Sequence, residues 1–288
     1  MNTPPFKSDH PYTLNCNGRL IILDQPIIMG ILNTTPDSFS DGGAYLDERS
    51  AIIHAEKMIA QGATIVDIGP QSTRPGARKI PSEEEIKRIG NIIKTIKLIH
   101  SEIMVSVDTF YASTAQYAAD QGADIINDIS AGQFDPEMLP TIARSNLAYV
   151  LMHVNSSYET MHQLREEENL AFELNRYFSS KLKTLKDMGI KSILLDPGFG
   201  FGKSIASQYD LINRLSLLVQ QQYPLLVGIS RKSFIYKPLG KNPKEVDDRT
   251  QELHYQVLQQ GAKILRVHDV ASTRQTIERF MSEAKAKI

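Results

Sequence analysis

The chain has 288 residues, 41% of them hydrophobic, and a formal net charge of −1 at pH 7. It is long enough to bury a full core, and its mixed charges argue against nonspecific nucleic-acid binding, which needs a sustained basic face. Cys16 is the only cysteine, which excludes a disulfide framework and a cysteine-rich metal site. We find no signal peptide and no apolar run of roughly 18 residues, so we expect a cytoplasmic protein without a membrane segment.

The N-terminal region divides into two parts. Residues 1–11 are expected to be flexible, and 12–288 are expected to form one domain, because no linker or like-charge block interrupts them. Within Tyr12–Asp24, the Asn17-Gly18 pair stands between two apolar patches. Asn-Gly favours a tight hairpin turn, and we expect this hairpin to close the bottom of a barrel.

A repeat predicts that barrel. Gln-Gly-Ala leads into an apolar run that ends in aspartate at Gln61–Asp67, Gln121–Asp128 and Gln260–Asp269, and Met188–Asp196 is a weaker copy. Glycine just past a helix, followed by a β-branched run, is typical of a helix end and a parallel strand start. We predict strands at Ile27–Asn33, Thr64–Gly69, Ile103–Asp108, Asp124–Ile129, Ala148–His153, Ser192–Asp196, Leu225–Ser230 and Lys263–His268. The fold expected is an α/β TIM (β/α)8 barrel whose strand ends share one mouth.

Apolar spacing of three and four predicts helices between the strands, at Ser50–Gln61, Glu83–Ile99, Ser113–Gln121 and Leu170–Met188. Ser82 and Glu85 match a capping box. A doubly wound open sheet is the alternative fold, but it usually carries a Gly-rich turn after its first strand. Here Asn33 is followed by Thr-Thr-Pro-Asp, which favours the barrel.

The first two loops after strands, residues 33–43 and 71–81, are long and polar. Such loops can fold over a bound substrate and keep water out. The alternative is that they are merely mobile connections.

Polar residues at strand ends suggest a site for a planar heterocycle. Asp108 and Asn127 close the third and fourth strands, and each alone could be a turn or cap residue. Asp196 closes the sixth strand and precedes a run of glycine and phenylalanine that imitates a nucleotide P-loop. The P-loop pattern fails at Pro197, where its first glycine is required. A buried carboxylate beside flat aromatic surface would instead accept hydrogen bonds from ring N–H and amino groups.

The last two strands end in cations. Arg266 and His268 are two residues apart and share a strand face, which suits a phosphate or diphosphate. The alternative is a solvated strand end with an ion pair to Asp269. Lys232 offers a cation at the rim, although a Schiff-base lysine would also suit this position. Ser233 is expected at a helix start, where it could hold a carboxylate.

Together these segments resemble the dihydropteroate synthase family over roughly residues 26–280. The matching motifs are Met29–Gly43, Ser72–Gly76, Ser106–Thr109, Ile126–Ile129, Leu195–Lys203, Ser230–Ser233 and Arg266–Val270.

The resemblance implies condensation of 6-hydroxymethyl-7,8-dihydropterin diphosphate with 4-aminobenzoate, by dissociative C–O cleavage, in a TIM-barrel homodimer that is a sulfonamide target. It implies catalytic roles for Arg266, His268, Lys232 and Asp108 and a Mg²⁺ ion on Asn33. The implied pterin site is Asp108, Asn127, Asp196, Lys232 and Arg266; the implied 4-aminobenzoate pocket is Thr73, Pro75, Phe39 and Ser233; the implied diphosphate site is Arg74, Arg266 and His268.

Two segments depart from the family pattern. Pro70-Gln71 replaces the usual Gly-Glu, and large polar residues replace small ones near Arg249, in a segment that we expect to open the last helix, away from the mouth. No two-residue insertion follows Gly76, so we predict sulfonamide sensitivity. The alternative functions are a pterin-binding methyltransferase and an inactive pterin-binding paralogue.

Overall fold

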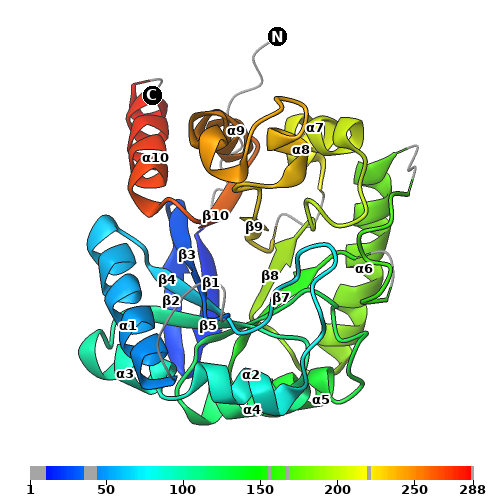
Figure 1. Cartoon of the computed structure of the whole chain (residues 1–288). Coiled ribbons are helices and arrows are strands. Elements are labelled where there is room, and N and C mark those ends of the chain that lie inside the picture. Colours follow the sequence, from blue (N-terminus) through cyan, green and yellow to red (C-terminus); the bar gives the residue numbers. More distant parts are fainter. Residues whose placement is uncertain (1–10, 36–43, 155–156, 166–168, 219–221, 287–288) are drawn as a thin grey trace.

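The computed structural model describes residues 11–35, 44–154, 157–165, 169–218 and 222–286. Eight parallel strands close into a barrel in the order β10-β3-β4-β5-β6-β7-β8-β9 (Figure 1). The strands are β3 (Ile27–Asn33), β4 (Ile65–Gly69), β5 (Met104–Asp108), β6 (Ile125–Asp128), β7 (Ala148–Met152), β8 (Ile193–Asp196), β9 (Leu225–Val227) and β10 (Ala262–Val267). The predicted barrel is confirmed, and the largest shift of a strand boundary is at β9, which ends at Val227 rather than Ser230.

Helices surround the strands as an outer layer (Figure 1). They are α1 (Ala44–Gln61), α2 (Ser82–Ile89), α3 (Ile92–Ile99), α4 (Ala112–Asp120), α5 (Met138–Arg144), α6 (Leu170–Asp187), α7 (Ile205–Arg214), α8 (Ser233–Tyr236), α9 (Asp247–Gln259) and α10 (Val270–Lys285), with 3-10 turns at Leu215–Leu217 and Pro243–Val246. In the described ranges, no helix is long and apolar enough to cross a membrane.

Two details of the second helical segment were predicted wrongly. The helix expected over Glu83–Ile99 is divided into α2 and α3 at Gly90, whose φ of 47° is left-handed. The capping box is also absent from the described start of α2, because Pro81 occupies the N-cap position. The Glu85 carboxylate is instead buried and accepts a hydrogen bond from Thr109 Oγ1 at 2.6 Å.

The predicted hairpin closes the bottom of the barrel. Its strands β1 (Tyr12–Cys16) and β2 (Arg19–Leu23) flank Asn17 and Gly18, whose φ angles of 52° and 82° are those of a two-residue hairpin turn. Its buried side chains form a second core with residues of the barrel interior: Tyr12, Leu14, Cys16 and Leu23 pack with Met29, Ile65, Met104, Ile125, Ala148, Val150, Leu194, Leu226 and Ile264. Apart from Pro11, the N-terminus predicted to be flexible lies outside the described residues.

The hairpin is also fastened by charge. Asp124, 1% exposed, accepts from Arg19 Nη2 on β2 at 2.8 Å, from Lys97 Nζ on α3 at 2.9 Å and from the amide of Val105 at 2.8 Å. One buried carboxylate therefore joins the hairpin, a helix and a barrel strand.

We predict that Asp124→Ala lowers the free energy of unfolding by about 1–3 kcal/mol, because it leaves the buried Val105 amide without its acceptor and removes the counter-charge of Arg19 and Lys97. Urea unfolding followed by circular dichroism measures this. The control is Asp187→Ala, which breaks an exposed pair with Lys183 and should cost less than about 1 kcal/mol. Equal losses in the two variants would contradict the fastening role of Asp124.

Candidate active site

Arg266 lies at the centre of the barrel mouth, between two carboxylates. Its Nε donates to Asp67 Oδ2 at 2.6 Å, and its Nη2 donates to Asp108 Oδ2 at 2.7 Å. Asn127 Nδ2 donates to Asp67 Oδ2 at 3.2 Å, and sheet register places Asn127 beside Asp108. The barrel therefore brings Asp108, Asn127 and Arg266 together as predicted, and adds Asp67, which the sequence reasoning did not assign to the site.

Burial sets the charge balance of this group. It raises the pKa of Asp108 to about 7, although Arg266 opposes the shift. Burial disfavours the charged form of Arg266, but Asp67 and Asp108 outweigh this and hold its pKa above the ordinary value. The guanidinium thus stays charged, while Asp108 can change its protonation state near neutral pH.

Asp196 and Lys232 face the same space. Asp196, buried at the end of β8, accepts from the amide of Gly198 at 2.7 Å, and burial raises its pKa. Lys232 Nζ lies 4.6 Å from the ring centroid of buried Phe201. Burial, reinforced by Arg266, lowers the Lys232 pKa to about 8, while Asp196 and Asp108 oppose the shift. The mouth therefore offers carboxylates, an ammonium group and an aromatic face to one ligand.

The loop after β8 packs closely against neighbouring backbone and does not offer a binding site for nucleotide phosphates. A Cβ on Gly198, whose φ is +69°, would lie 2.1 Å from the His153 carbonyl oxygen, so only glycine fits. Lys203, 3% exposed, donates to the carbonyl oxygens of Gly198 at 2.9 Å and Phe201 at 3.3 Å. Its ammonium group binds the loop itself, which agrees with the prediction that this segment is not a nucleotide P-loop.

His268 lies among cations. Burial and, after it, the charges of Arg231, Arg266, Lys232 and Arg74 together lower its pKa to about 3. A neutral imidazole surrounded by four positive side chains is suited to receive an anion.

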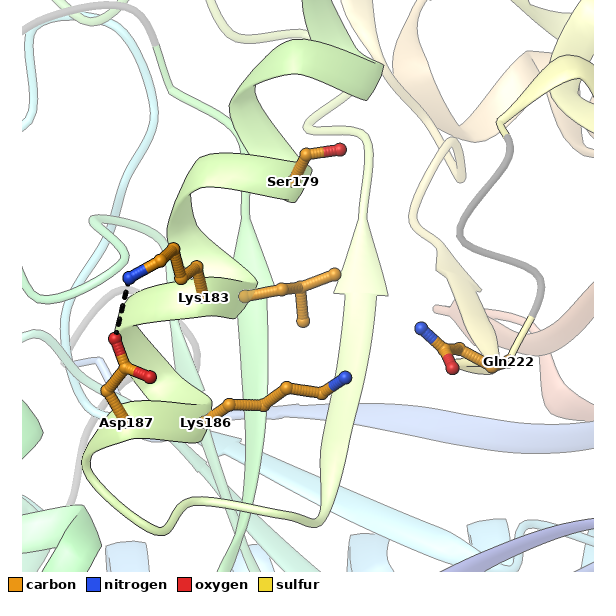
Figure 2. A pocket seen from close by; sticks show the side chains of 6 residues that line it. Ser179, Lys183, Lys186, Asp187 and Gln222 are labelled. Carbon is orange, nitrogen blue, oxygen red and sulfur yellow. Dashed lines mark hydrogen bonds and ion pairs between the residues drawn. The ribbon is translucent and has the colours of Figure 1, made fainter.

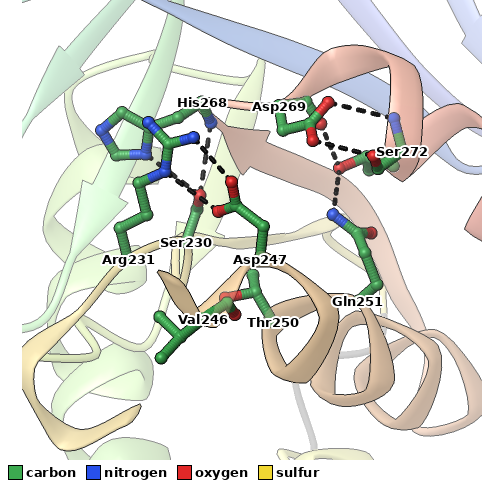
Figure 3. Close-up of polar contacts among 10 residues, drawn as sticks. Ser230, Arg231, Val246, Asp247, Thr250, Gln251, His268, Asp269 and Ser272 are labelled. Atoms are coloured by element: carbon green, nitrogen blue, oxygen red, sulfur yellow. Dashed lines mark hydrogen bonds and ion pairs between the residues drawn. The ribbon is translucent and has the colours of Figure 1, made fainter. Parts of the chain in front are cut away.

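The neighbouring turn is fixed by polar contacts (Figure 3). His268 Nδ1 is 3.0 Å from Ser230 Oγ, and Arg231 makes a bidentate pair with Asp247, with Nε–Oδ1 3.0 Å and Nη2–Oδ2 2.8 Å. Asp269 caps α10 by accepting from the amide of Ser272 at 3.1 Å. The alternative prediction, a solvated strand end with an ion pair to Asp269, is wrong for Arg266, whose side chain is 18% exposed and pairs with Asp67 and Asp108.

Of the remaining predicted residues, Thr73, Arg74 and Pro75 lie in the loop after β4, and Ser233 lies at the start of α8. The carbonyl oxygen of Thr73 is 2.8 Å from His162 Nε2, and Arg74 and Pro75 are exposed in the same loop. Ser233 begins α8, as predicted, and is half-buried. Phe39 lies outside the described residues.

Asn33 ends β3 opposite Gly69 on β4. A Cβ at position 69 would lie 3.2 Å from Asn33 Oδ1, so the glycine leaves room beside this oxygen. Within the described part of the chain, no cluster of three or more His, Cys, Asp or Glu residues could hold a metal ion.

The second departure from the family pattern lies outside the mouth. The segment around Arg249 opens α9, not the last helix as predicted; the last helix is α10. Arg249 pairs with Glu252 on the surface, and Gln251 bonds to Thr273 and Thr276 of α10 at 3.2 and 2.9 Å. These residues join two outer helices.

A cavity of about 300 Å³ lies against α6. Figure 2 shows its lining, in which Lys183 and Asp187 form an ion pair of 3.0 Å and Gln222 faces the helix. Its lining residues, Ser179, Leu182, Lys183, Lys186, Asp187 and Gln222, include none of the side chains of the mouth. The mouth remains the candidate active site.

Comparisons with known proteins agree with this placement. The pterin-binding enzyme family model matches residues 29–268. The dihydropteroate synthase of Escherichia coli is 39% identical over 276 residues, which are 95% of this chain and 97% of the relative. A Xanthomonas albilineans dihydropteroate synthase structure with 4-aminobenzoic acid is 35% identical, with a TM-score of 0.87 and 98% coverage of both chains. A Yersinia pestis dihydropteroate synthase structure with a sulfonamide drug is 37% identical, with a TM-score of 0.88 and coverage of 95% and 99%. The chain belongs to the dihydropteroate synthase family of pterin-binding enzymes and is a transferase.

Proposed function

We propose that this chain condenses 6-hydroxymethyl-7,8-dihydropterin diphosphate with 4-aminobenzoate by a dissociative route, using the mouth described above. The observation that carries the proposal is the sharing of Arg266 by Asp67 and Asp108 beside Lys232 and His268. This arrangement separates a carboxylate-rich region from a cation-rich region within one site. A pterin diphosphate has the matching asymmetry, with hydrogen-bond donors on its ring and negative charge on its tail.

The pterin ring would occupy the carboxylate-rich region. Asp108 and Asp196 would accept hydrogen bonds from ring N–H and amino groups, and Asn127 can both donate and accept. Lys232 would donate to a ring acceptor while Phe201 lies against its other side. When the C–O bond breaks, the two carboxylates would offset the positive charge that develops on the pterin.

The diphosphate would occupy the cation-rich region. Arg266 and His268 lie at its base, and Arg74 is close enough to lower the His268 pKa. Positive groups held in advance around the leaving group stabilise the charge that accumulates on it. An arriving diphosphate would also raise the pKa of His268, since it opposes the surrounding cations.

The proposed function includes a Mg²⁺ ion that Asn33 would bind. Mg²⁺ prefers oxygen ligands, keeps several waters and often binds through one protein group plus substrate phosphates. The space beside Asn33 Oδ1, left by Gly69, fits such a single protein ligand. When bound, Mg²⁺ would neutralise part of the diphosphate charge.

The second substrate would bind under the loop of residues 70–81, with Thr73, Pro75 and Ser233, and with Phe39 of the first loop. The arylamine is itself a competent nucleophile, so no catalytic serine, cysteine or Schiff-base lysine is needed. Exclusion of water by the loops would protect the pterin cation. A homodimer, a cytoplasmic location and a single domain over residues 12–288 with a flexible N-terminus remain part of the proposal.

The two alternative functions have less support. A methyltransferase would not need both Lys232 and the positively charged side chains around His268. The sequence departures at Gln71 and Arg249 are the support for an inactive paralogue. Arg249, however, makes its contacts on an outer helix and not in the mouth.

We predict that the purified protein forms dihydropteroate and diphosphate from the two substrates and Mg²⁺. Arg266→Ala should lower kcat/KM by a factor of about 10³ or more, because it removes the central cation from the leaving group, while circular dichroism shows a folded protein. Arg176→Ala, at an exposed residue of α6, is the control and should retain activity. Normal turnover by Arg266→Ala would exclude the diphosphate assignment.

The activity should depend on pH through Asp108 and Lys232. As the pH falls through about 7, Asp108 gains a proton and ceases to be a carboxylate acceptor; as it rises through about 8, Lys232 loses its charge. A plot of kcat/KM for pterin diphosphate against pH should therefore fall on both sides. Lys232→Arg stays charged and should move only the alkaline fall to higher pH. An alkaline fall that does not move in this variant would belong to another group.

We predict that sulfamethoxazole inhibits in competition with 4-aminobenzoate. The Yersinia pestis relative has been solved with a sulfonamide drug, and this chain has no insertion after Gly76. Initial rates at several concentrations of both compounds measure the effect. Turnover that persists at saturating sulfamethoxazole would contradict the assigned pocket.

A further inference from the structure

His162 lies between two parts of the mouth. Its ring stacks on that of Phe201, with centroids 5.4 Å apart and an interplanar angle of 17°. Its Nε2 is 2.8 Å from the carbonyl oxygen of Thr73. Because a carbonyl oxygen only accepts, Nε2 carries the hydrogen and donates it. One imidazole thus contacts both the loop after β8 and the loop of residues 70–81.

These contacts continue to the proposed pterin site. The Phe201 ring contacts both the His162 imidazole and the Lys232 ammonium group, which lies 4.6 Å from its centroid. The segment that carries His162 is itself anchored, because the amide of Arg165 donates to the Gly202 carbonyl oxygen at 2.9 Å. A continuous path therefore runs from Lys232 through Phe201 and His162 to Thr73.

The other end of the same loop is held independently of His162. Lys79 Nζ lies 5.1, 5.4 and 5.5 Å from the ring centroids of Phe110, Tyr111 and Tyr158, distances typical of cation–π contacts. Tyr111 also donates its hydroxyl to the Ile80 carbonyl oxygen at 2.8 Å. The end of the loop is therefore fixed near residues 79–80, and His162 holds the part that carries Thr73 and Arg74.

We propose that His162 is a positioning residue that places Thr73 and Arg74 over the second-substrate pocket and couples them to occupancy of the pterin site. This inference rests on the proposed function and deepens it. His162 reaches no reacting group itself; it acts through the Thr73 backbone and the Phe201 ring. When the pterin engages Lys232 beside Phe201, the stacked imidazole holds the loop in place.

The first test separates the two substrates. His162→Ala should raise KM for 4-aminobenzoate about tenfold and change KM for pterin diphosphate by less than about twofold, because it removes one hydrogen bond and one ring contact that act on the loop. His162→Gln keeps a donor and should restore most of the loss, whereas His162→Phe keeps only the ring. Equal KM values for 4-aminobenzoate in wild type and His162→Ala would overturn the proposal.

The second test needs no turnover. Hydrogen exchange followed by mass spectrometry reports on the part of the loop that His162 holds, where the amide of Ala77 donates to the Arg74 carbonyl oxygen at 3.0 Å. His162→Ala should speed amide exchange over residues 73–77 and abolish the protection from exchange that pterin diphosphate gives the wild type. Residues 79–80, whose contacts do not involve His162, are the internal comparison.

A matched control distinguishes coupling from general loosening. Tyr158→Phe keeps the ring near Lys79 and loses only a long bond of 3.5 Å to the Ala77 carbonyl oxygen, so amide exchange and its protection by the ligand should stay as in wild type. Ligand protection that survives in His162→Ala refutes the coupling. If the wild type makes no dihydropteroate yet amide exchange responds as expected, the proposed function fails and the positioning role stands.

Discussion

The mouth of this barrel depends on one buried ionic group, the Arg266 guanidinium held by Asp67 and Asp108. Removing charges from water is costly, and the cost is recovered only where geometry and further hydrogen bonds are good. Here the two bonds are 2.6 and 2.7 Å long, and Asn127 donates a third to Asp67. The partners come from β4, β5, β6 and β10, so the group can form only when the sheet closes. The same closure that completes the fold therefore assembles the site.

This group also divides the mouth electrically. Asp108 and Asp196 lie on one side, and His268 lies among cations on the other. The electric field across the mouth therefore favours one orientation of a ligand that has a neutral, donor-rich ring and an anionic tail. Arg266 lies at the boundary and serves both sides. Its pairing with carboxylates before substrate binds means that the cation is already in place when the leaving group becomes charged, which lowers the reorganisation needed during reaction.

The barrel was predictable because its signals are local and repeated: glycine after α1, α4, α6 and α9, a β-branched run, and a polar strand end. The same signals located Asp108, Asn127 and Arg266. Asp67 ends one copy of the repeat, but nothing local distinguishes a carboxylate that pairs with Arg266, 199 positions away, from one that caps a turn. His162 had no motif at all, since its role arises from a ring and a carbonyl that meet only in the fold. The Ser82 capping box failed for the same reason, because Glu85 has a distant partner in Thr109.

The change at Gln71 shows why a departure from a family motif need not remove the chemistry. Gln71 Oε1 accepts from the amide of Ile80 at 2.6 Å, a bond that a glutamate oxygen could also make. Arg88 secures the preceding residue by donating to the Pro70 carbonyl oxygen at 3.0 Å. The cost is visible in the buried Nε2 of Gln71, which has no partner among the described residues, and an unpaired buried donor lowers stability. The substitution thus changes how the base of the loop is held and leaves Arg266, Asp67, Asp108 and Asn127 untouched, which argues for an active enzyme over an inactive paralogue.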